Sequence, residues 1–185
     1  MEFFSQIDDK HRDFIARQPV FFVATAAEGC RVNVSPKGMD VFRVLGPNRV
    51  AYLDLGGSGN ETQAHLSVDG RITIMFCAFD NPALIMRLYG RGSFTVIGDP
   101  GFDELAAHFS LLPGTRQIFD IAVDSLQTSC GWAVPRMTLE KERDTLVRFH
   151  AQQDPTERLA TIAKRNKSID GLPVRVQTVM PVIEA

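Results

Sequence analysis

The chain has 185 residues, of which 44% are hydrophobic and 23% charged, proportions that are typical of a globular protein with a real core. Its net charge is −2 and its isoelectric point is about 6.1, so no basic excess indicates binding to nucleic acid or to an anionic membrane. We expect one domain over residues 1–185 that acts on a small molecule.

The cysteines and the N-terminus point to a reducing compartment. Cys30, Cys77 and Cys130 are isolated, with no Cys-x-x-Cys pair and no histidine at ligand spacing, so we predict neither a disulfide framework nor a metal site. The first residues lack the basic start and apolar run of a secretory signal, and no stretch approaches the ~20 apolar residues of a membrane helix. These features predict a cytoplasmic protein that does not bind a membrane.

The chain begins with a helical pattern and continues with strands. Residues 5–17 carry apolar side chains at helical spacing, and Pro19 stops this helix. Residues 20 to 98 then hold runs that are rich in β-branched and aromatic residues and are bounded by Gly, Pro, Asn or Asp. The predicted strands cover 20–27, 31–36, 41–46, 49–55, 71–79 and 83–98. Their alternation predicts one dry and one polar face, with Val32 and Val34 on the dry face.

Few helices interrupt these strands. The segment 60–68 is too short for repeated βαβ crossovers, which argues against a Rossmann domain. Further on, we predict a helix in 101–112, a strand in 117–129, and helices in 138–153 and 155–166, followed by an extended tail. The sum is a mainly β (α+β) fold, a six- or seven-stranded antiparallel barrel with peripheral helices. Its parts are an N-terminal helix (1–18), the barrel with inserted helices (19–130), and C-terminal helices with a tail (131–185).

A glycine-rich turn between a strand and a helix is the first candidate site. Gly56-Gly57-Ser58-Gly59 is not closed by Gly-Lys-Ser/Thr, so it is not a Walker A loop. Glycines let backbone amides approach a ligand, and the first turn of a helix favours an anion. We expect Asn60 to cap the helix, and Ser58, Asn60 and Thr62 to offer hydrogen bonds to a phosphate. The alternative is a plain β-to-α turn that needs positive φ.

A second polar cluster lies in the run CRVNVSPKGMDVF. Arg31, Asn33 and Ser35 fall on one predicted strand face, and Lys37 and Gly38 follow in a turn. If this strand pairs beside 49–55, Lys37 or Arg31 supplies the cation that the glycine turn lacks. The alternative is that Arg31 and Lys37 are solvated strand ends. The four histidines are scattered over predicted helices and form neither a metal site nor a Ser-His-Asp triad, so no catalytic residue is assigned.

Several runs carry a family resemblance. The runs NVSPKG, GSGNETQAHL before DGRITIMF, and MRLYGRGSFTVI resemble the pyridoxamine 5′-phosphate oxidase-like flavoproteins of the FMN-binding split-barrel fold. QTSCGWAVP and KRNKSIDGLP resemble a bacterial subgroup of that family whose members are mostly of unknown substrate. The similarity covers roughly residues 15–175, and SCGWAVP followed by SIDGLP is its most specific part.

The resemblance implies a homodimer with two FMN sites between its subunits and the isoalloxazine ring against the sheet. The implied FMN contacts are Arg31, Asn33, Ser35, Lys37 and Gly38 on the lining strand, Ser58, Gly59, Asn60 and Thr62 at the phosphate turn, and Trp132 near the flavin. The oxidases themselves have Arg-Lys after the serine of the turn, where this chain has Gly59-Asn60. The Arg and Trp pattern by which they hold pyridoxal phosphate is also missing, which argues against pyridoxamine phosphate as the substrate.

The predicted function is therefore that of an FMN-dependent oxidoreductase acting on an unidentified small molecule. Because the cofactor performs the redox chemistry, the protein needs no assigned acid or base for this prediction. Two alternatives stay open. One is a split barrel that uses a deazaflavin or haem, with His65 as the nearest axial ligand. The other is a flavin-binding module without catalytic activity. Cys130 is interpreted as a small buried residue, and Trp132 as either core or site.

Overall fold

A single antiparallel sheet dominates the structure, a computed structural model that describes residues 1–181. The strands follow the order β3-β2-β6-β7-β8-β5-β4, and a short strand, β1, pairs with β8 outside this path. Their bounds are β1 (Glu2–Phe4), β2 (Val20–Thr25), β3 (Asn33–Gly38), β4 (Phe42–Gly46), β5 (Arg49–Leu55), β6 (Arg71–Cys77), β7 (Leu84–Val96) and β8 (Thr115–Cys130). The mainly β prediction is confirmed, and β1 is an addition that the sequence pattern did not reveal.

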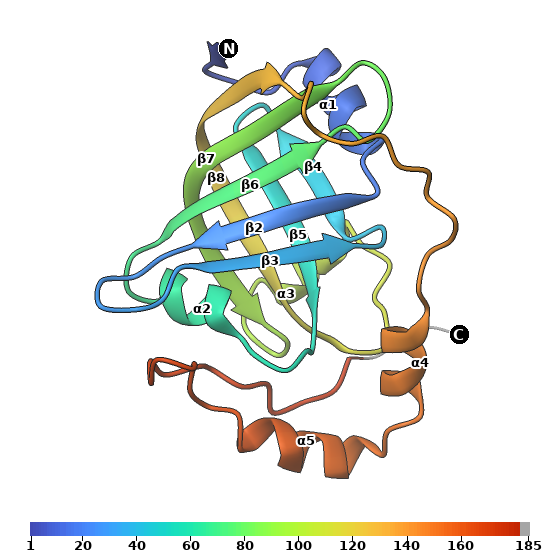
Figure 1. Ribbon diagram of the computed structural model, residues 1–185. Helices are drawn as coiled ribbons and strands as arrows, with labels where there is room; N and C mark the ends of the chain where they lie inside the picture. The colour runs from blue at the N-terminus through green and yellow to red at the C-terminus, as the bar shows by residue number, and fades with distance from the viewer. Residues whose placement is uncertain (182–185) are drawn as a thin grey trace.

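The sheet curls into a split barrel around an aromatic core. Figure 1 shows β2, β3 and β6 passing in front of β5 and β8. Phe21 on β2 reaches across the interior to Phe42 on β4 and Tyr52 on β5, with ring centroids 5.0 and 5.6 Å apart. Each half of the sheet buries its apolar face against the other, which supplies the main driving force for the curl.

The strand β3 does not pair beside β5 as the sequence analysis assumed. It pairs with β2, with Thr25 opposite Asn33 and Val23 opposite Ser35, because a short connection between consecutive strands favours an antiparallel hairpin. Facing residues of such a pair share one side of the sheet. Since Val23 and Thr25 are buried, Asn33 and Ser35 also point inward.

The predicted dry face of β3 is therefore wrong. Val32 and Val34 are 71% and 62% exposed, whereas Asn33, Ser35 and Lys37 are half-buried. Asn33 bonds to Thr25 and Thr62, and Lys37 pairs with Asp54, so the hydrophobicity of single residues did not decide the orientation. Arg31 precedes β3 and is exposed, and thus does not share that strand face.

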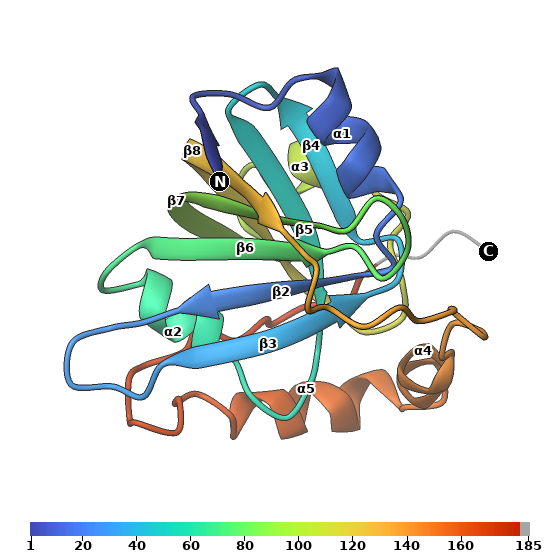
Figure 2. The same cartoon turned by 45° about the horizontal axis from the view of Figure 1, so that its top comes forward.

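Five helices surround the sheet in the described part of the chain, namely α1 (Asp9–Ala16), α2 (Glu61–Leu66), α3 (Phe102–Ala106), α4 (Thr145–Ala151) and α5 (Pro155–Ala163). The helix predicted over 138–153 is confirmed only from Thr145 onward. Within residues 1–181, no helix is both long enough and apolar enough to span a membrane. In Figures 1 and 2, α5 runs across the end of the barrel near the β5–α2 connection, and the following chain turns back between α5 and the barrel.

Candidate functional site

A cavity of about 600 Å³ lies where the C-terminal helices meet the end of the barrel. Its walls come from the glycine turn (56–60), the start of β8, the helices α4 and α5, and residues 164–177. This volume falls within the range of small-molecule and cofactor sites, roughly 300–1,000 Å³. The glycine turn that the sequence singled out therefore opens onto a ligand-sized space.

The cavity is strongly basic. Its lining contains no Asp or Glu among the described residues, but it does contain six cationic side chains: Arg116, Arg158, Lys164, Arg165, Lys167 and Arg175. Two of these have acidic partners outside the lining, since Arg116 pairs with Asp54 and Arg175 with Asp99. The net field inside the cavity consequently favours an anion.

Arg158 is the most deeply buried of these cations. Its side chain comes from α5 and is only 4% exposed, and its Nη2 atom has no hydrogen-bond partner in the described part of the chain. Burial lowers the pKa of the Arg158 guanidinium, and the neighbouring charge of Arg116 lowers it further. A buried guanidinium without an acceptor is unfavourable, so this atom marks the place where an anionic ligand would bind.

Glycines allow the C-terminal helices to approach the turn this closely. Gly114 has φ +102°, and a Cβ atom there would lie 2.3 Å from His150 Cδ2, so no other residue fits. His150 Nε2 lies 2.7 Å from the Gly56 carbonyl oxygen, and Arg165 donates a 2.8 Å hydrogen bond to the Gly57 carbonyl. A Cβ built on Gly56 would lie 3.6 Å from Arg158 Nη2, which places the guanidinium directly beside the turn.

Asn60 does not cap α2 as predicted. Its φ and ψ are −145° and 45°, and its side chain makes no capping bond. Instead Asn60 Oδ1 accepts a 2.8 Å hydrogen bond from Gln117, whose amide also donates to Asp54 at 2.8 Å. Because Gln117 bridges the two, it fixes the Asn60 side chain at the wall of the cavity rather than over the helix terminus.

The C-terminal segment is docked on α2 by the same kind of network. Gln63 is fully buried, and its Oε1 accepts a 2.7 Å bond from the Arg175 amide while its Nε2 donates to the Arg175 carbonyl at 3.0 Å. This strand-like exchange holds residues 174–177 against the barrel. The wall of the cavity is therefore anchored by a buried glutamine that bonds the backbone of the C-terminal segment.

A separate charge cluster forms around Asp54 at the end of β5. Asp54 is 2% exposed, and its carboxylate lies 2.5 Å from Arg116 and 3.6 Å from Lys37. Burial opposes ionisation, but Arg116 and then Lys37 outweigh it and hold the pKa of Asp54 below its usual value. Lys37 thus lies near the end of β5 although β3 pairs with β2, and its charge is met by a carboxylate. Its predicted contact with a phosphate stays a prediction.

The remaining predicted residues divide between several places. Asn33 Nδ2 donates to Thr62 Oγ1 at 3.1 Å and to Thr25 Oγ1 at 3.2 Å, so Asn33 and Thr62 come together away from the cavity lining. Ser35 Oγ is buried without a partner within residues 1–181, and Gly38 ends β3. Of the predicted contacts, Ser58, Gly59 and Asn60 line the cavity.

Arg31 and Trp132 lie elsewhere. Arg31 pairs with Asp170 through its guanidinium, and its backbone amide donates to the same carboxylate at 2.8 Å. Trp132 follows β8 and is 87% exposed, and Cys130 is exposed rather than buried as predicted. Neither Arg31 nor Trp132 lines the cavity, and their predicted FMN contacts stay predictions.

The cationic residues of the cavity were not predicted from the sequence. They come from the start of β8, from α5 and from the segment that follows α5, and they share no motif or spacing: Arg116, Arg158, Lys164, Arg165, Lys167 and Arg175. The signal that was available is compositional, because residues 143–175 contain several arginines and lysines. On helices, such charges usually face solvent, and only the docking of α5 turns Arg158 inward.

The antiparallel sheet curled around one core places the protein in the class of split-barrel proteins, with a basic cavity at the strand-to-helix glycine turn. Within this class, a family profile described as pyridoxamine 5′-phosphate oxidase matches residues 7–130, more than half of the chain. The chain therefore belongs to the pyridoxamine 5′-phosphate oxidase family, as the sequence resemblance indicated. The helices α4 and α5 and the tail lie beyond the matched residues.

Individual relatives agree with this assignment. A pyridoxamine 5′-phosphate oxidase family protein of Aspergillus flavus, ustO, is 40% identical over 148 residues, 77% of this chain. The chain matches 59% of the length of that relative. Among solved structures, a variant of HupZ from Group A Streptococcus has a TM-score of 0.54 at 20% identity, covering 66% of this chain and 99% of HupZ.

A candidate pyridoxamine 5′-phosphate oxidase from Lactobacillus delbrueckii also has a TM-score of 0.54, at 11% identity, covering 67% of this chain and 95% of its own. At these identities the two structures support the fold of the barrel.

Proposed function

We propose that the protein is an FMN-dependent oxidoreductase that acts on an unidentified small molecule, with the FMN phosphate bound in the basic cavity. The observation that carries this proposal is the buried, unpartnered Nη2 of Arg158 beside the glycine turn, within the part of the chain that the structure describes. Phosphate is the part of FMN that needs such a cation. Family membership supports a flavin, and the volume of the cavity suits a cofactor.

The residues of the cavity can be assigned to parts of the ligand. Arg158 and Arg116 would face the phosphate, and Ser58, Gly59 and Asn60 would add hydroxyl, amide and carboxamide contacts from the turn. Lys37, Asn33 and Thr62 would act indirectly, because they hold Asp54 and α2 in place. When bound, FMN supplies the ability to accept and pass on a hydride equivalent.

The homodimer implied by the family resemblance belongs to the same proposal. Val32 and Val34 are exposed on β3, an edge strand of the sheet, and in the loop just before it, and an exposed apolar edge favours pairing with another chain. Trp132, Met137 and Leu139 add exposed apolar area after β8. A partner subunit covering these residues would place the flavin ring at the interface, near the predicted contacts of β3 and Trp132.

The alternatives make different demands on the residues. A haem would need an axial ligand that faces the cavity, but His65 is 1% exposed and does not line it. His150 does line the cavity, and its two ring nitrogens lie 2.7 Å from the Gly56 carbonyl oxygen and 3.1 Å from Gln153 Oε1. A deazaflavin phosphate would use the same anion site, and its absorbance spectrum distinguishes it from FMN. A flavin-binding module without catalysis would retain FMN that no nicotinamide cofactor reduces.

The decisive experiment compares FMN with riboflavin, which lacks the phosphate. We expect the full chain to retain FMN after desalting, and Arg158→Met to lose about 1.5–3 kcal/mol of FMN binding, roughly 10- to 150-fold. Riboflavin affinity should change less than about 2-fold in the same variant, because no phosphate contact is lost. Arg148→Met is the matched control, since Arg148 is an exposed arginine on α4 outside the cavity lining.

Two outcomes would contradict the proposal. If the wild-type protein retains neither FMN nor riboflavin, it does not bind a flavin and the proposal is wrong. If Arg158→Met loses FMN affinity and riboflavin affinity equally, Arg158 does not bind the phosphate, and the FMN phosphate does not lie in this cavity. If FMN is retained, its reduction by nicotinamide cofactors then separates the oxidoreductase from the module without catalytic activity.

A further inference from the structure

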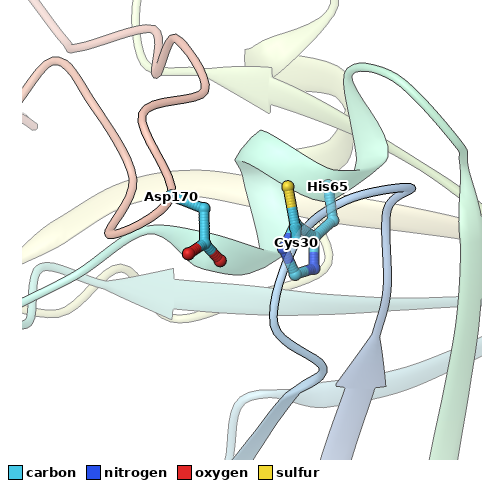
Figure 3. A group of neighbouring side chains, drawn as sticks. All are labelled: Cys30, His65 and Asp170. Atoms are coloured by element: carbon cyan, nitrogen blue, oxygen red, sulfur yellow. The ribbon is translucent and has the colours of Figure 1, made fainter.

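Three side chains with metal-binding groups meet on the side of α2 that faces the loop between β2 and β3. Cys30 comes from that loop, His65 from α2 and Asp170 from a turn in the C-terminal segment. Figure 3 shows the three side chains converging from these separate segments, and their ligand atoms lie within 4.8 Å of one another. The residues are 35 and 105 positions apart, so no sequence spacing revealed them.

His65 gives the strongest indication of a missing partner. Its side chain is 1% exposed, and Nδ1 lies 3.0 Å from Thr25 Oγ1. The other ring nitrogen, Nε2, is buried without a hydrogen-bond partner within residues 1–181. A buried imidazole nitrogen without a partner is unfavourable. Since Nδ1 is engaged by Thr25, Nε2 is the nitrogen that remains for a ligand.

The surroundings of the three residues suit coordination. When a histidine binds a metal through one nitrogen, the other commonly donates to an oxygen that fixes the ring, and Thr25 Oγ1 is in that position. Asp170 is oriented by the Arg31 amide and guanidinium. A carboxylate offers about four lone-pair sites, so these two donors leave room for a metal. Cys30 is half-buried and held by a turn in which its amide donates to the Ala27 carbonyl at 3.1 Å.

We propose that Cys30, His65 and Asp170 bind a divalent transition metal ion, for which Zn²⁺ is the best match. Thiolate, imidazole and carboxylate are the three ligand types of zinc sites, and three protein ligands leave a fourth position for water or another ligand. Tetrahedral zinc bonds would place the ligand atoms about 3.3–3.6 Å apart, so the atoms need to approach by no more than about 1.5 Å. On binding, the Cys30 thiol loses its proton to solvent, and the two anionic ligands neutralise the ion.

The proposed ion would connect three parts of the fold and does not depend on flavin binding. It would tie the turn at Asp170 to α2 and to the β2–β3 loop. That turn lies within residues 164–177, the segment that contributes one wall of the basic cavity. Metal binding should therefore stabilise the docked C-terminal segment, since only the folded chain brings the ligands together.

The test is a Co²⁺ titration of the full chain after treatment with a chelator. We expect one equivalent of Co²⁺ to give a thiolate-to-cobalt charge-transfer band, with d–d intensity typical of four-coordinate geometry, and Zn²⁺ to displace it. Cys30→Ser should abolish the charge-transfer band, and Asp170→Asn should weaken Co²⁺ binding by at least about 10-fold. Cys130→Ser is the matched control, because Cys130 is a free, exposed cysteine outside the cluster.

Thr25→Val tests the positioning role of Thr25 without touching a ligand. We expect it to weaken metal affinity by about 10- to 100-fold while the charge-transfer band persists at saturating Co²⁺. The proposal is overturned if the wild-type protein shows no charge-transfer band, if the band survives Cys30→Ser, or if Cys130→Ser removes it. Urea unfolding of each variant without metal shows whether a lost band reflects lost folding.

Discussion

Two charged regions flank the glycine turn, and they differ in how their charges are compensated. Around Asp54, a buried carboxylate meets two cations, Arg116 and Lys37. Across the turn, Arg158 is equally buried, but its Nη2 meets no acceptor within residues 1–181. In the first region the buried charge has its counter-charges, whereas in the second we propose that an anionic ligand supplies the missing one.

The comparison separates structural charges from ligand-binding charges on physical grounds. A buried ion pair contributes to a defined fold, and the protein loses stability when one partner of the pair is removed. A buried cation without a partner costs stability in the free protein, and an anionic ligand that binds it offsets that cost. Substitutions in the two regions should therefore have opposite effects on stability and on ligand affinity.

The largest expected effect is at Asp54. Asp54→Asn keeps the shape of the side chain but leaves Arg116 and Lys37 without a counter-charge. We expect a loss of about 3 kcal/mol in the free energy of unfolding, the low end for one partner of a buried pair, because both cations are partly exposed. Urea denaturation measures it. FMN affinity should not fall, since Arg116 already lines the cavity and only its carboxylate partner is lost. Weakened FMN binding at full stability would reverse the assignment of the two regions.

The pH dependence of stability follows from the same carboxylate. The pKa of Asp54 is lowered in the folded state, so its contribution is fully present above the unfolded pKa, about 3.9, and is lost as the pH falls through the folded value. We expect the stability difference between wild type and Asp54→Asn to be constant from about pH 7 to 5 and to shrink below about pH 4. A difference that grows on acidification would mean that the folded pKa of Asp54 is raised.

In the cavity, inorganic phosphate should act as a stabilising ligand through Arg158. Phosphate at 100 times its dissociation constant would stabilise the folded state by about 2.7 kcal/mol. We expect Arg158→Met to lose most of this effect while its stability without phosphate is equal to or above that of wild type, since an uncompensated buried charge is removed. Thermal unfolding with and without phosphate measures both quantities. Equal phosphate stabilisation in wild type and variant would place the anion elsewhere.

The sequence predicted local features better than the site that they form. The strand 49–55 and the glycine turn after it were located correctly because β-propensity and glycine clusters are local signals. The valines at β3 were misplaced because strand pairing, not residue hydrophobicity, decides which face points inward. Arg158, and the cluster of Cys30, His65 and Asp170, could not be found because tertiary docking brings those residues together from distant segments.

The smallest predicted effect concerns Thr62, which the sequence placed at the phosphate and the structure places against Asn33. Thr62 Oγ1 accepts the Asn33 Nδ2 hydrogen bond at 3.1 Å and is buried. Thr62→Val keeps the size of the side chain and removes one of the two acceptors of Asn33 Nδ2, which keeps its bond to Thr25 Oγ1. We expect a loss of about 1 kcal/mol in unfolding free energy and FMN affinity within about 2-fold of wild type.

Thr62→Ser, which keeps the hydroxyl, is the matched control and should restore the hydrogen bond. A fall in FMN affinity with unchanged stability in Thr62→Val would instead put the hydroxyl at the phosphate. The glycine turn would then bind its anion on the side of α2 that faces β3, rather than in the cavity under α5.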